Sequence, residues 1–327
     1  MNNKRVVSGM RPTGRLHLGH FHGVLANWLE LQKEYECFFF AADWHSLTTE
    51  YADTSGIRES TQEMVLDWLA FGLDPQRCII FQQSLVPHHA ELNLILSMIT
   101  PVSWLERNPT YKEMQENLES RDLSTFGFLG YPVLMAADII IYKATRVPVG
   151  HDQLPHLEIT REIARRFNHL YGKVFPEPEA ILTETPKLLG LDGRKMSKSY
   201  GNSIYLSETA EETRKKIMAM VTDTNRVRRS DPGEPDRCVA FNLHRLYVPQ
   251  EKLDEIIPAC RGAEIGCVEC KKILADNVIE KLAPFRAKRD ELASRPGLVE
   301  EVLVEGSKRA SDESGKTLAE VRTALTF

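Results

Sequence analysis

The sequence lacks three features that would point to a membrane, exported or repetitive protein. It has no apolar run of about 18 residues, which excludes a membrane-spanning helix. Its N-terminus has no charged segment followed by an apolar one, as a secretory signal would, and there is no internal repeat or low-complexity tract. We therefore expect a cytoplasmic protein. The 327 residues, 27% charged and 42% hydrophobic, are typical of one large globular domain or two ordinary ones.

The sequence also lacks an excess of positive charge. A formal net charge of −5 excludes a generally basic nucleic-acid-binding surface, although it leaves room for a local one. Two basic clusters, at 214–216 and 226–229, either contact RNA or form solvated edges of a helix and a loop.

Apolar strand patterns alternate with helix-like segments over residues 1–205. This alternation predicts an α/β fold, a Rossmann-like doubly wound parallel sheet that binds ligands at the carboxyl ends of its strands. We expect strands at Arg5–Ser8, Glu36–Ala42, Cys78–Gln82 and Arg146–Val149, a loop and strand within Val174–Pro186, and helices near 20–34, 56–72, 88–99, 130–142 and 152–170.

After Tyr205 the strand signal fades and helical patterns take over. They are expected at 207–222, 239–247, 250–258, 267–295 and 298–325, interrupted by a polar loop at 222–235. We predict a catalytic domain over 1–205 and an α-helical domain over 206–327, whose last helix folds back on the first domain.

The string His17-Leu18-Gly19-His20 is the first candidate for a functional site. It follows a short strand and a turn and leads into a helix, so backbone N–H groups at that helix end offer a place for an anion. Gly19 allows close approach of the backbone to a ligand, and the two imidazoles can both face it. Taken alone, such a string is usually a turn with incidental histidines.

The string Lys195-Met196-Ser197-Lys198-Ser199 is the second candidate. It carries two ammonium groups three residues apart beside small hydroxyls. Residues 191–194, just before it, indicate a loop. Alone it reads as a solvated basic loop. Together with the histidine string, and in this order, it is suited to binding the triphosphate of ATP from two sides.

The two strings together resemble the signature motifs of the class I aminoacyl-tRNA synthetases. The resemblance implies that His17, His20, Lys195 and Lys198 stabilise the reacting triphosphate of ATP, which binds with Mg²⁺. It implies ATP contacts from Arg11, Pro12, Thr13, Gly19, His20, Gly150, His151, Asp152, Leu188, Lys195, Met196, Ser197, Lys198 and Ser199.

The segment 131–139 bears on the amino acid. If it is helical, Tyr131, Met135 and Asp138 share one face. An indole N–H only donates a hydrogen bond, and an acceptor-only carboxylate beside an apolar methionine matches it. The segment resembles that of the tryptophan enzymes of the class, in which this aspartate binds the indole nitrogen.

The same resemblance extends the substrate site and names the partners. It implies tryptophan contacts from Asp138, Met135, Tyr131, Gln153, His45 and Val7, with tRNA(Trp) as the second substrate. It implies homodimerisation through a connecting segment at about 100–145. The open alternatives are a tyrosine enzyme, which Met135 disfavours, a synthetase-like RNA-binding protein that no longer charges tRNA, and a smaller nucleotidyltransferase.

Three positions depart from the common bacterial pattern of the tryptophan enzymes. His20 stands where an asparagine is frequent, Arg11 where a glutamine is frequent, and Val7 where many carry an aromatic residue that stacks on the indole.

Four of the six cysteines crowd into one region as C-x21-C-x6-C-x2-C, at Cys238, Cys260, Cys267 and Cys270. In a cytosolic protein this spacing favours a metal site over disulfides, either tetrahedral zinc or a [4Fe–4S] cluster. It resembles a subset of tryptophan enzymes that carry a [4Fe–4S] cluster in the anticodon-side domain. Zinc and an empty thiol set are the alternatives.

Overall fold

The structure is a computed structural model that describes residues 4–108, 124–182 and 188–326. The chain forms two compact units. The first comprises residues 1–14, 27–184 and 295–327, and the second comprises 15–26 and 185–294. The assignment of residues 1–205 and 206–327 to separate functional domains stays a prediction.

The first unit is built on a five-stranded sheet in which every described pairing is parallel. The strand order is β3-β2-β1-β4-β5, so the direction of winding reverses between β1 and β4. Apolar side chains are buried along the central strands, as expected for a parallel sheet covered on both faces. The strands are β1 (Arg5–Met10), β2 (Glu36–Ala41), β3 (Ile79–Gln82), β4 (Arg146–Val149) and β5 (Glu179–Leu182). The α/β fold class is thereby confirmed.

The helices of the first unit follow the predicted order with two additions. Sequence periodicity missed α3 (Asp43–Glu50) and α6 (Val102–Glu106), which are short. The others are α2 (Ala26–Glu34), α4 (Ile57–Phe71), α5 (His88–Ser97), α8 (Phe126–Ile140), α9 (Leu154–Tyr171) and α14 (Leu298–Ala324), with single 3₁₀ turns at Gln83–Leu85 and His151–Gln153.

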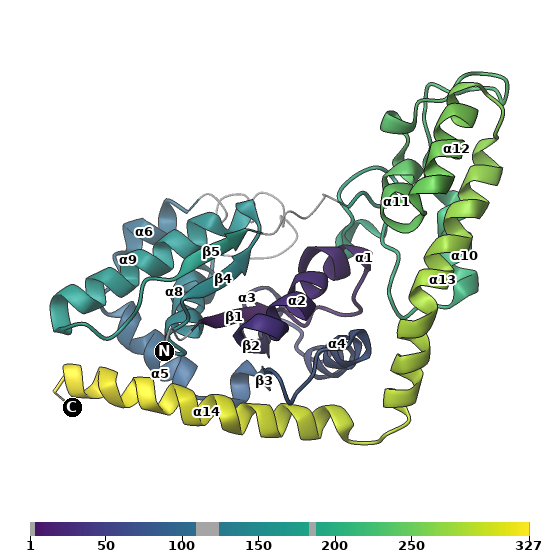
Figure 1. Cartoon of the computed structure of the whole chain (residues 1–327). Coiled ribbons are helices and arrows are strands. Elements are labelled where there is room, and N and C mark those ends of the chain that lie inside the picture. The colour runs from purple at the N-terminus through teal and green to yellow at the C-terminus, as the bar shows by residue number, and fades with distance from the viewer. Residues whose placement is uncertain (1–3, 109–123, 183–187, 327) are drawn as a thin grey trace. The chain divides into compact units, whose positions relative to one another are not determined.

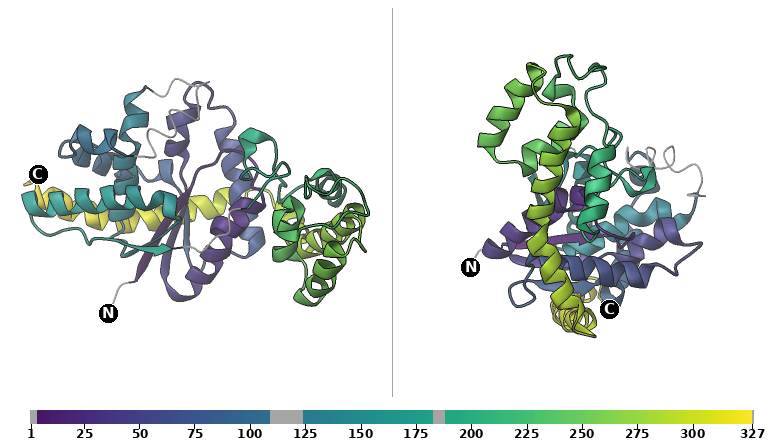
Figure 2. Two further views of the ribbon diagram at one scale, coloured as in Figure 1. Left: turned by 90° about the horizontal axis from the view of Figure 1, so that it is seen from above. Right: turned by 90° about the vertical axis from the view of Figure 1, so that its right-hand side faces the viewer.

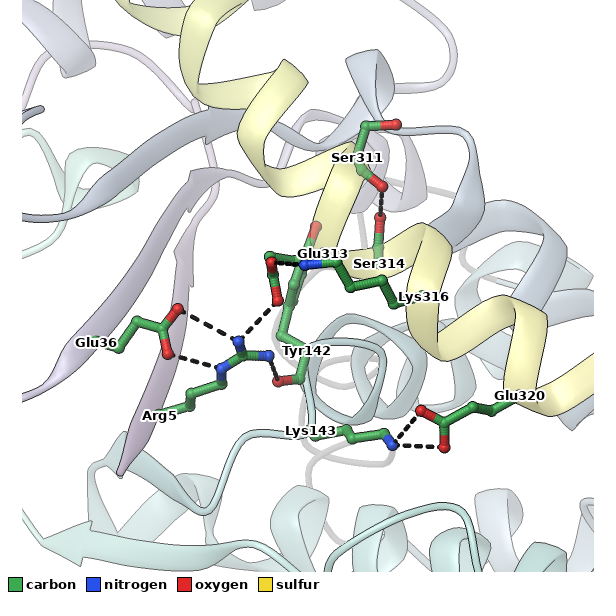
Figure 3. Close-up of polar contacts among 9 residues, drawn as sticks. All are labelled: Arg5, Glu36, Tyr142, Lys143, Ser311, Glu313, Ser314, Lys316 and Glu320. Carbon is green, nitrogen blue, oxygen red and sulfur yellow. Dashed lines mark hydrogen bonds and ion pairs between the residues drawn. The ribbon is translucent and has the colours of Figure 1, made fainter. Parts of the chain in front are cut away.

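The last helix, α14, packs on the edge of this unit against β3, α4 and α5 (Figure 1 and Figure 2). Gly306 makes the approach close, because a Cβ there would lie 1.8 Å from the carbonyl oxygen of Ile80. Ion pairs add to this packing, as Figure 3 shows: Arg5 binds Glu313 at 2.7 Å, and Lys143 binds Glu320 at 2.6 Å.

The second unit is helical, as predicted for most of its length. It begins with the single turn α1 (Leu18–His20) and a π-helical turn (Phe21–Leu25) that leads into α2. Its other helices are α10 (Ala210–Ala219), α11 (Val239–Tyr247), α12 (Gln250–Arg261) and α13 (Cys267–Ala293), with 3₁₀ turns at Lys198–Tyr200 and Pro235–Arg237. None of the helices in the described ranges is long and apolar enough to cross a membrane.

Candidate functional site

A cavity of about 450 Å³ opens in the first unit where the strand order reverses. Residues at the carboxyl ends of β1 and β4 form one side of it, and α8 and the start of α9 form another. This is the position at which doubly wound sheets bind ligands. All six residues predicted to contact the amino acid line this one cavity: Val7, His45, Tyr131, Met135, Asp138 and Gln153. Their individual roles stay predictions.

Asp138 is the most strongly hydrogen-bonded group of the cavity and is 1% exposed. Its carboxylate accepts from His45 Nε2 at 2.8 Å, from His89 Nδ1 at 2.6 Å, and from Gln83 Nε2 at 2.8 and 2.9 Å. Burial raises the pKa of this carboxyl, but the hydrogen bonds from His45 and His89 outweigh it and leave the pKa below its ordinary value. Asp138 is therefore a buried acceptor that stays ionised.

Two of these donors, Gln83 and His89, escaped the sequence analysis. They follow β3 and begin α5, and no local pattern distinguishes them from core polar residues. Only the tertiary structure brings them to Asp138, His89 through the packing of α5 on α8 and Gln83 through the turn that follows β3.

A second polar pair lines the cavity beside Asp138. The Tyr131 hydroxyl lies 2.5 Å from His156 Nε2. Burial lowers the pKa of His156 to about 4, so its imidazole is neutral at pH 7. The Nδ1 atom of His156 is buried and has no hydrogen-bond partner among the described atoms. His156 was also missed; it lies in the first turn of α9, three residues after Gln153, which ends the preceding 3₁₀ turn.

In the second unit, the backbone fixes the tautomers of the histidine string. His17 Nδ1 accepts from the Gly19 N–H at 3.1 Å, and His20 Nδ1 accepts from the His17 N–H at 3.1 Å. Because both Nδ1 atoms accept, the proton of each neutral ring sits on Nε2.

Both rings are neutral at pH 7. Burial, with a contribution from the Lys198 ammonium, lowers the pKa of His17 to about 4. Burial together with His17 and Lys198 holds the pKa of His20 well below its ordinary value. The two rings lie 3.8 Å apart between centroids. They form a pair of uncharged N–H donors near one lysine.

The lysine string is held by a short hairpin. The Gly190 N–H donates to the Arg194 carbonyl at 2.8 Å, and the Met196 N–H donates to the Leu188 carbonyl at 2.9 Å. The side chain of Met196 is buried, whereas Lys195 is exposed and Lys198 half-buried. The hairpin therefore anchors the methionine and leaves both ammonium groups accessible.

Asn202 secures the other side of this loop. Its Oδ1 accepts from the Ser197 N–H at 2.8 Å, and its Nδ2 donates to Asp192 at 2.7 Å and to the Lys195 carbonyl at 3.2 Å. The residue is 3% exposed and was not singled out from the sequence.

The predicted ATP contacts divide between the two units. Arg11, Pro12, Thr13, Gly150, His151 and Asp152 belong to the first unit, just beyond β1 and β4. Gly19, His20, Leu188, Lys195, Met196, Ser197, Lys198 and Ser199 belong to the second. At Gly150 a Cβ would lie 2.6 Å from the Asp152 carboxylate, so the carboxylate approaches the backbone there.

The four clustered cysteines line one small cavity of about 20 Å³ in the second unit, together with Arg226 and Lys271. Cys270 Sγ lies 3.2 Å from His244 Nε2. Within the described ranges, no three or more histidine, cysteine or acidic side chains are arranged to hold a metal ion.

An apolar groove of about 800 Å³ lies on the surface of the first unit between α3, α5, α6 and α8. It exposes Leu94, Met98, Val102 and Phe126, the last being 82% exposed. Part of the predicted connecting segment at 100–145, residues 109–123, lies outside the described residues.

Comparison with known protein sequences identifies the family of the chain. The sequence model of the family "tRNA synthetases class I (W and Y)" matches residues 1–283. A tryptophan–tRNA ligase of Thermotoga maritima is 54% identical over 99% of both chains, and one of Aquifex aeolicus is 48% identical over 99% of this chain and 100% of its own.

A solved structure extends the comparison to the fold. The tryptophanyl-tRNA synthetase of Campylobacter jejuni, crystallised with ADP and tryptophan, superposes with a TM-score of 0.90 at 31% identity and covers 99% of this chain and all of its own. The chain therefore belongs to the class I aminoacyl-tRNA synthetases of the tryptophan and tyrosine group.

Proposed function

We propose that this protein joins L-tryptophan to tRNA(Trp) at the expense of ATP, as a tryptophan–tRNA ligase of the cytoplasm. The observation that carries the choice of amino acid is the buried, ionised Asp138 carboxylate in a largely apolar cavity. The names of its relatives and the predicted ATP motifs support the reaction. The alternatives are a tyrosine-specific enzyme and a synthetase-like RNA-binding protein without charging activity.

Indole recognition rests on the difference between donors and acceptors. Asp138 can only accept, which suits the indole N–H, whereas a phenol hydroxyl is served best by a donor and an acceptor together. Met135 and the apolar wall that includes Val7, Phe40 and Ile139 suit the faces of the ring. Tyr131 and Gln153 offer oxygen atoms to the substrate ammonium group.

In the first step the tryptophan carboxylate attacks the α-phosphorus of ATP. The bond from that phosphorus to the bridging oxygen breaks, and pyrophosphate leaves with the electron pair. The carboxylate needs no general base, so catalysis consists of positioning and stabilisation of the leaving charge. The Nε2–H groups of His17 and His20 donate to phosphate oxygens, and Lys195 and Lys198 neutralise the pyrophosphate. Mg²⁺, when bound, shares that charge through phosphate oxygens and water.

In the second step the terminal ribose of the tRNA supplies the nucleophile. Its hydroxyl oxygen attacks the carbonyl carbon of tryptophanyl-adenylate, the hydroxyl proton is lost, and AMP leaves. The basic clusters at 214–216 and 226–229 are candidate tRNA contacts.

Amino-acid-dependent exchange of pyrophosphate into ATP, measured with each of the twenty amino acids, tests the proposed function. We expect exchange with tryptophan alone. Preferred exchange with tyrosine would establish the tyrosine enzyme, and no exchange with any amino acid would favour the non-charging protein.

Lys195→Ala should lower the tryptophan-dependent exchange rate about a hundredfold, which is the usual cost of losing one charged transition-state contact. Lys252→Ala removes an exposed lysine from α12 of the same unit and should leave the rate unchanged. If Lys195→Ala exchanged as fast as Lys252→Ala, Lys195 would have no role in the transition state.

Asp138→Asn should reduce the preference for tryptophan over tyrosine by roughly 10- to 100-fold in kcat/KM. The reason is that a hydrogen bond to a charged group contributes about 1.5–3 kcal/mol, and an amide can present either a donor or an acceptor. Asp43→Asn is the matched control, because Asp43 is buried and accepts from Gln82 but does not line the cavity. Retention of the parental preference by Asp138→Asn would contradict the assignment.

We further propose that Cys238, Cys260, Cys267 and Cys270 hold a [4Fe–4S] cluster, with zinc as the alternative and an empty thiol set as the third possibility. Four thiols lining one cavity are a suitable donor set, and Arg226 and Lys271 offset thiolate charge. Four thiolates can also hold tetrahedral zinc, so the spacing C-x21-C-x6-C-x2-C is what favours the cluster.

The proposed cluster has a structural role. Arg226 lines the cysteine cavity and donates to the carbonyls of Arg229 at 2.7 Å and Ile265 at 3.0 Å. It thereby ties the basic loop 226–229 to the start of α13. A filled cavity would brace this loop, which we propose meets the anticodon.

Protein purified without oxygen should be brown and absorb at about 400 nm. It should contain about four iron atoms per chain, as one cubane cluster requires. Cys267→Ser should lose this absorption, whereas Cys78→Ser, in the core of the other unit, should keep it. A colourless preparation with one zinc per chain would establish the zinc alternative.

We propose that the apolar groove is the homodimer interface. Contiguous apolar side chains exposed on α5, α6 and α8 are costly in water and typical of a surface that meets another protein. In sedimentation velocity we expect the parent to run as a dimer and Met98→Glu, at a side chain 74% exposed, to run as a monomer. Monomeric parent protein would contradict the proposal.

A further inference from the structure

A chain of hydrogen bonds runs from Asp138 away from the cavity into the core. His89 Nδ1 lies 2.6 Å from Asp138 Oδ1, and His89 Nε2 lies 2.6 Å from the Tyr142 hydroxyl. The carbonyl of Tyr142 accepts from Arg5, which also binds Glu313 in the C-terminal helix α14. The side chains of Asp138, His89 and Tyr142 are 1% exposed or less. The carboxylate that faces the substrate is thus connected to a helix more than 170 positions further along the chain.

The chemistry of the groups sets the direction of this chain. A carboxylate only accepts, so His89 Nδ1 must carry a proton and donate it to Asp138. In a neutral imidazole Nε2 then accepts, and the Tyr142 hydroxyl donates to it. Burial, with the neighbouring Asp138 charge, holds the pKa of Tyr142 well above its ordinary value, so the phenol keeps its proton.

The backbone of Tyr142 is tied to α14, as Figure 3 shows. Arg5 donates to the Tyr142 carbonyl at 3.1 Å and at the same time binds Glu313 of α14 at 2.7 Å. The next residue, Ser314, donates to the Ser311 carbonyl at 3.2 Å. Tyr142 is therefore held at its hydroxyl by His89 and at its carbonyl by Arg5.

Gln83 also donates to Asp138 but is held differently from His89. Its amide donates to both Asp138 oxygens, but its own Oε1 is buried without a hydrogen-bond partner in the described part of the chain. The amide of Gln83 is thus held through Asp138, whereas His89 is anchored independently through Tyr142.

We propose that His89 and Tyr142 are positioning residues that aim the Asp138 carboxylate at the indole N–H. This inference rests on the proposed function, because it presumes that Asp138 binds the indole.

The test compares tryptophan with its benzothiophene analogue, in which sulfur replaces the indole N–H. Tyr142→Phe keeps the ring but removes the donor to His89. We expect the KM for tryptophan in pyrophosphate exchange to rise about fivefold, which is the usual contribution of one hydrogen bond. The KM values for ATP and for the analogue should change less than about twofold. The preference for tryptophan over the analogue should therefore fall by about the same fivefold factor as the KM for tryptophan rises.

A second variant and a control complete the test. His89→Asn can keep an amide donor near the position of Nδ1 but loses the contact with the Tyr142 hydroxyl, so it should narrow the same preference by a similar factor. Ser307 is buried on α14, accepts from the Gln82 N–H and has no hydrogen bond to Asp138, His89 or Tyr142 within the described residues. Ser307→Ala should change the melting temperature without changing the preference. Should Tyr142→Phe fail to fold, His89→Asn and Ser307→Ala decide the question.

The outcomes separate this inference from the proposed function. A parent enzyme that uses tryptophan and the analogue equally well would overturn the role of Asp138 and the inference with it. A parent that discriminates, with a folded Tyr142→Phe or His89→Asn variant that keeps the parental ratio, would overturn this inference alone. Equal narrowing by Ser307→Ala would show that the effect is a general loosening of α14 and would likewise overturn it.

Discussion

The structure of the first unit depends on keeping one buried carboxylate charged. An ionised aspartate removed from water is stable only when hydrogen-bond donors replace the water. For Asp138 these donors come from α3, from the turn after β3 and from α5, while the aspartate itself lies on α8. Four segments must therefore meet at one point, and their meeting shapes the wall of the cavity. The need to satisfy the charge and the need to form a substrate pocket are met by the same contacts.

The topology of the parallel sheet places this meeting point of four segments beside the carboxyl ends of β1 and β4. Because the winding reverses between β1 and β4, the segments that follow these two strands diverge and leave a space beyond their carboxyl ends. Side chains from β1, β4, α8 and α9 surround this space, and apolar groups outnumber polar ones among them. The polar groups among them are therefore the ones that can orient a ligand: Ser8, Arg11, His45, Thr48, Tyr131, Asp138, Gln153 and His156.

The second unit also holds its candidate site residues in fixed positions, but through different contacts. Its histidines are fixed by backbone N–H groups rather than by side chains, and burial keeps them neutral. Its lysines lie on a hairpin that is held by the buried Met196 and by Asn202. Uncharged donors on a rigid turn and cations on a neighbouring loop suit the proposed binding of ATP, because the former can position phosphate oxygens while the latter can approach developing charge.

Local patterns determined much of this protein. The alternation of strands and helices, the helices after Tyr205 and the two ATP strings depend on residues near one another in the chain, so the fold class and the family could be predicted. All six predicted tryptophan contacts also line one cavity, because the family motif preserves their spacing. What the pattern did not contain were Gln83, His89, Tyr142 and His156. These side chains are ordinary in their local context and gain their partners only when α5, α8 and α9 pack. The sequence by itself thus determined which elements form and that a carboxylate faces the pocket. Only the tertiary structure decided which groups hold that carboxylate, since a hydrogen bond requires two atoms to lie about 3 Å apart and separation along the chain says nothing about that distance.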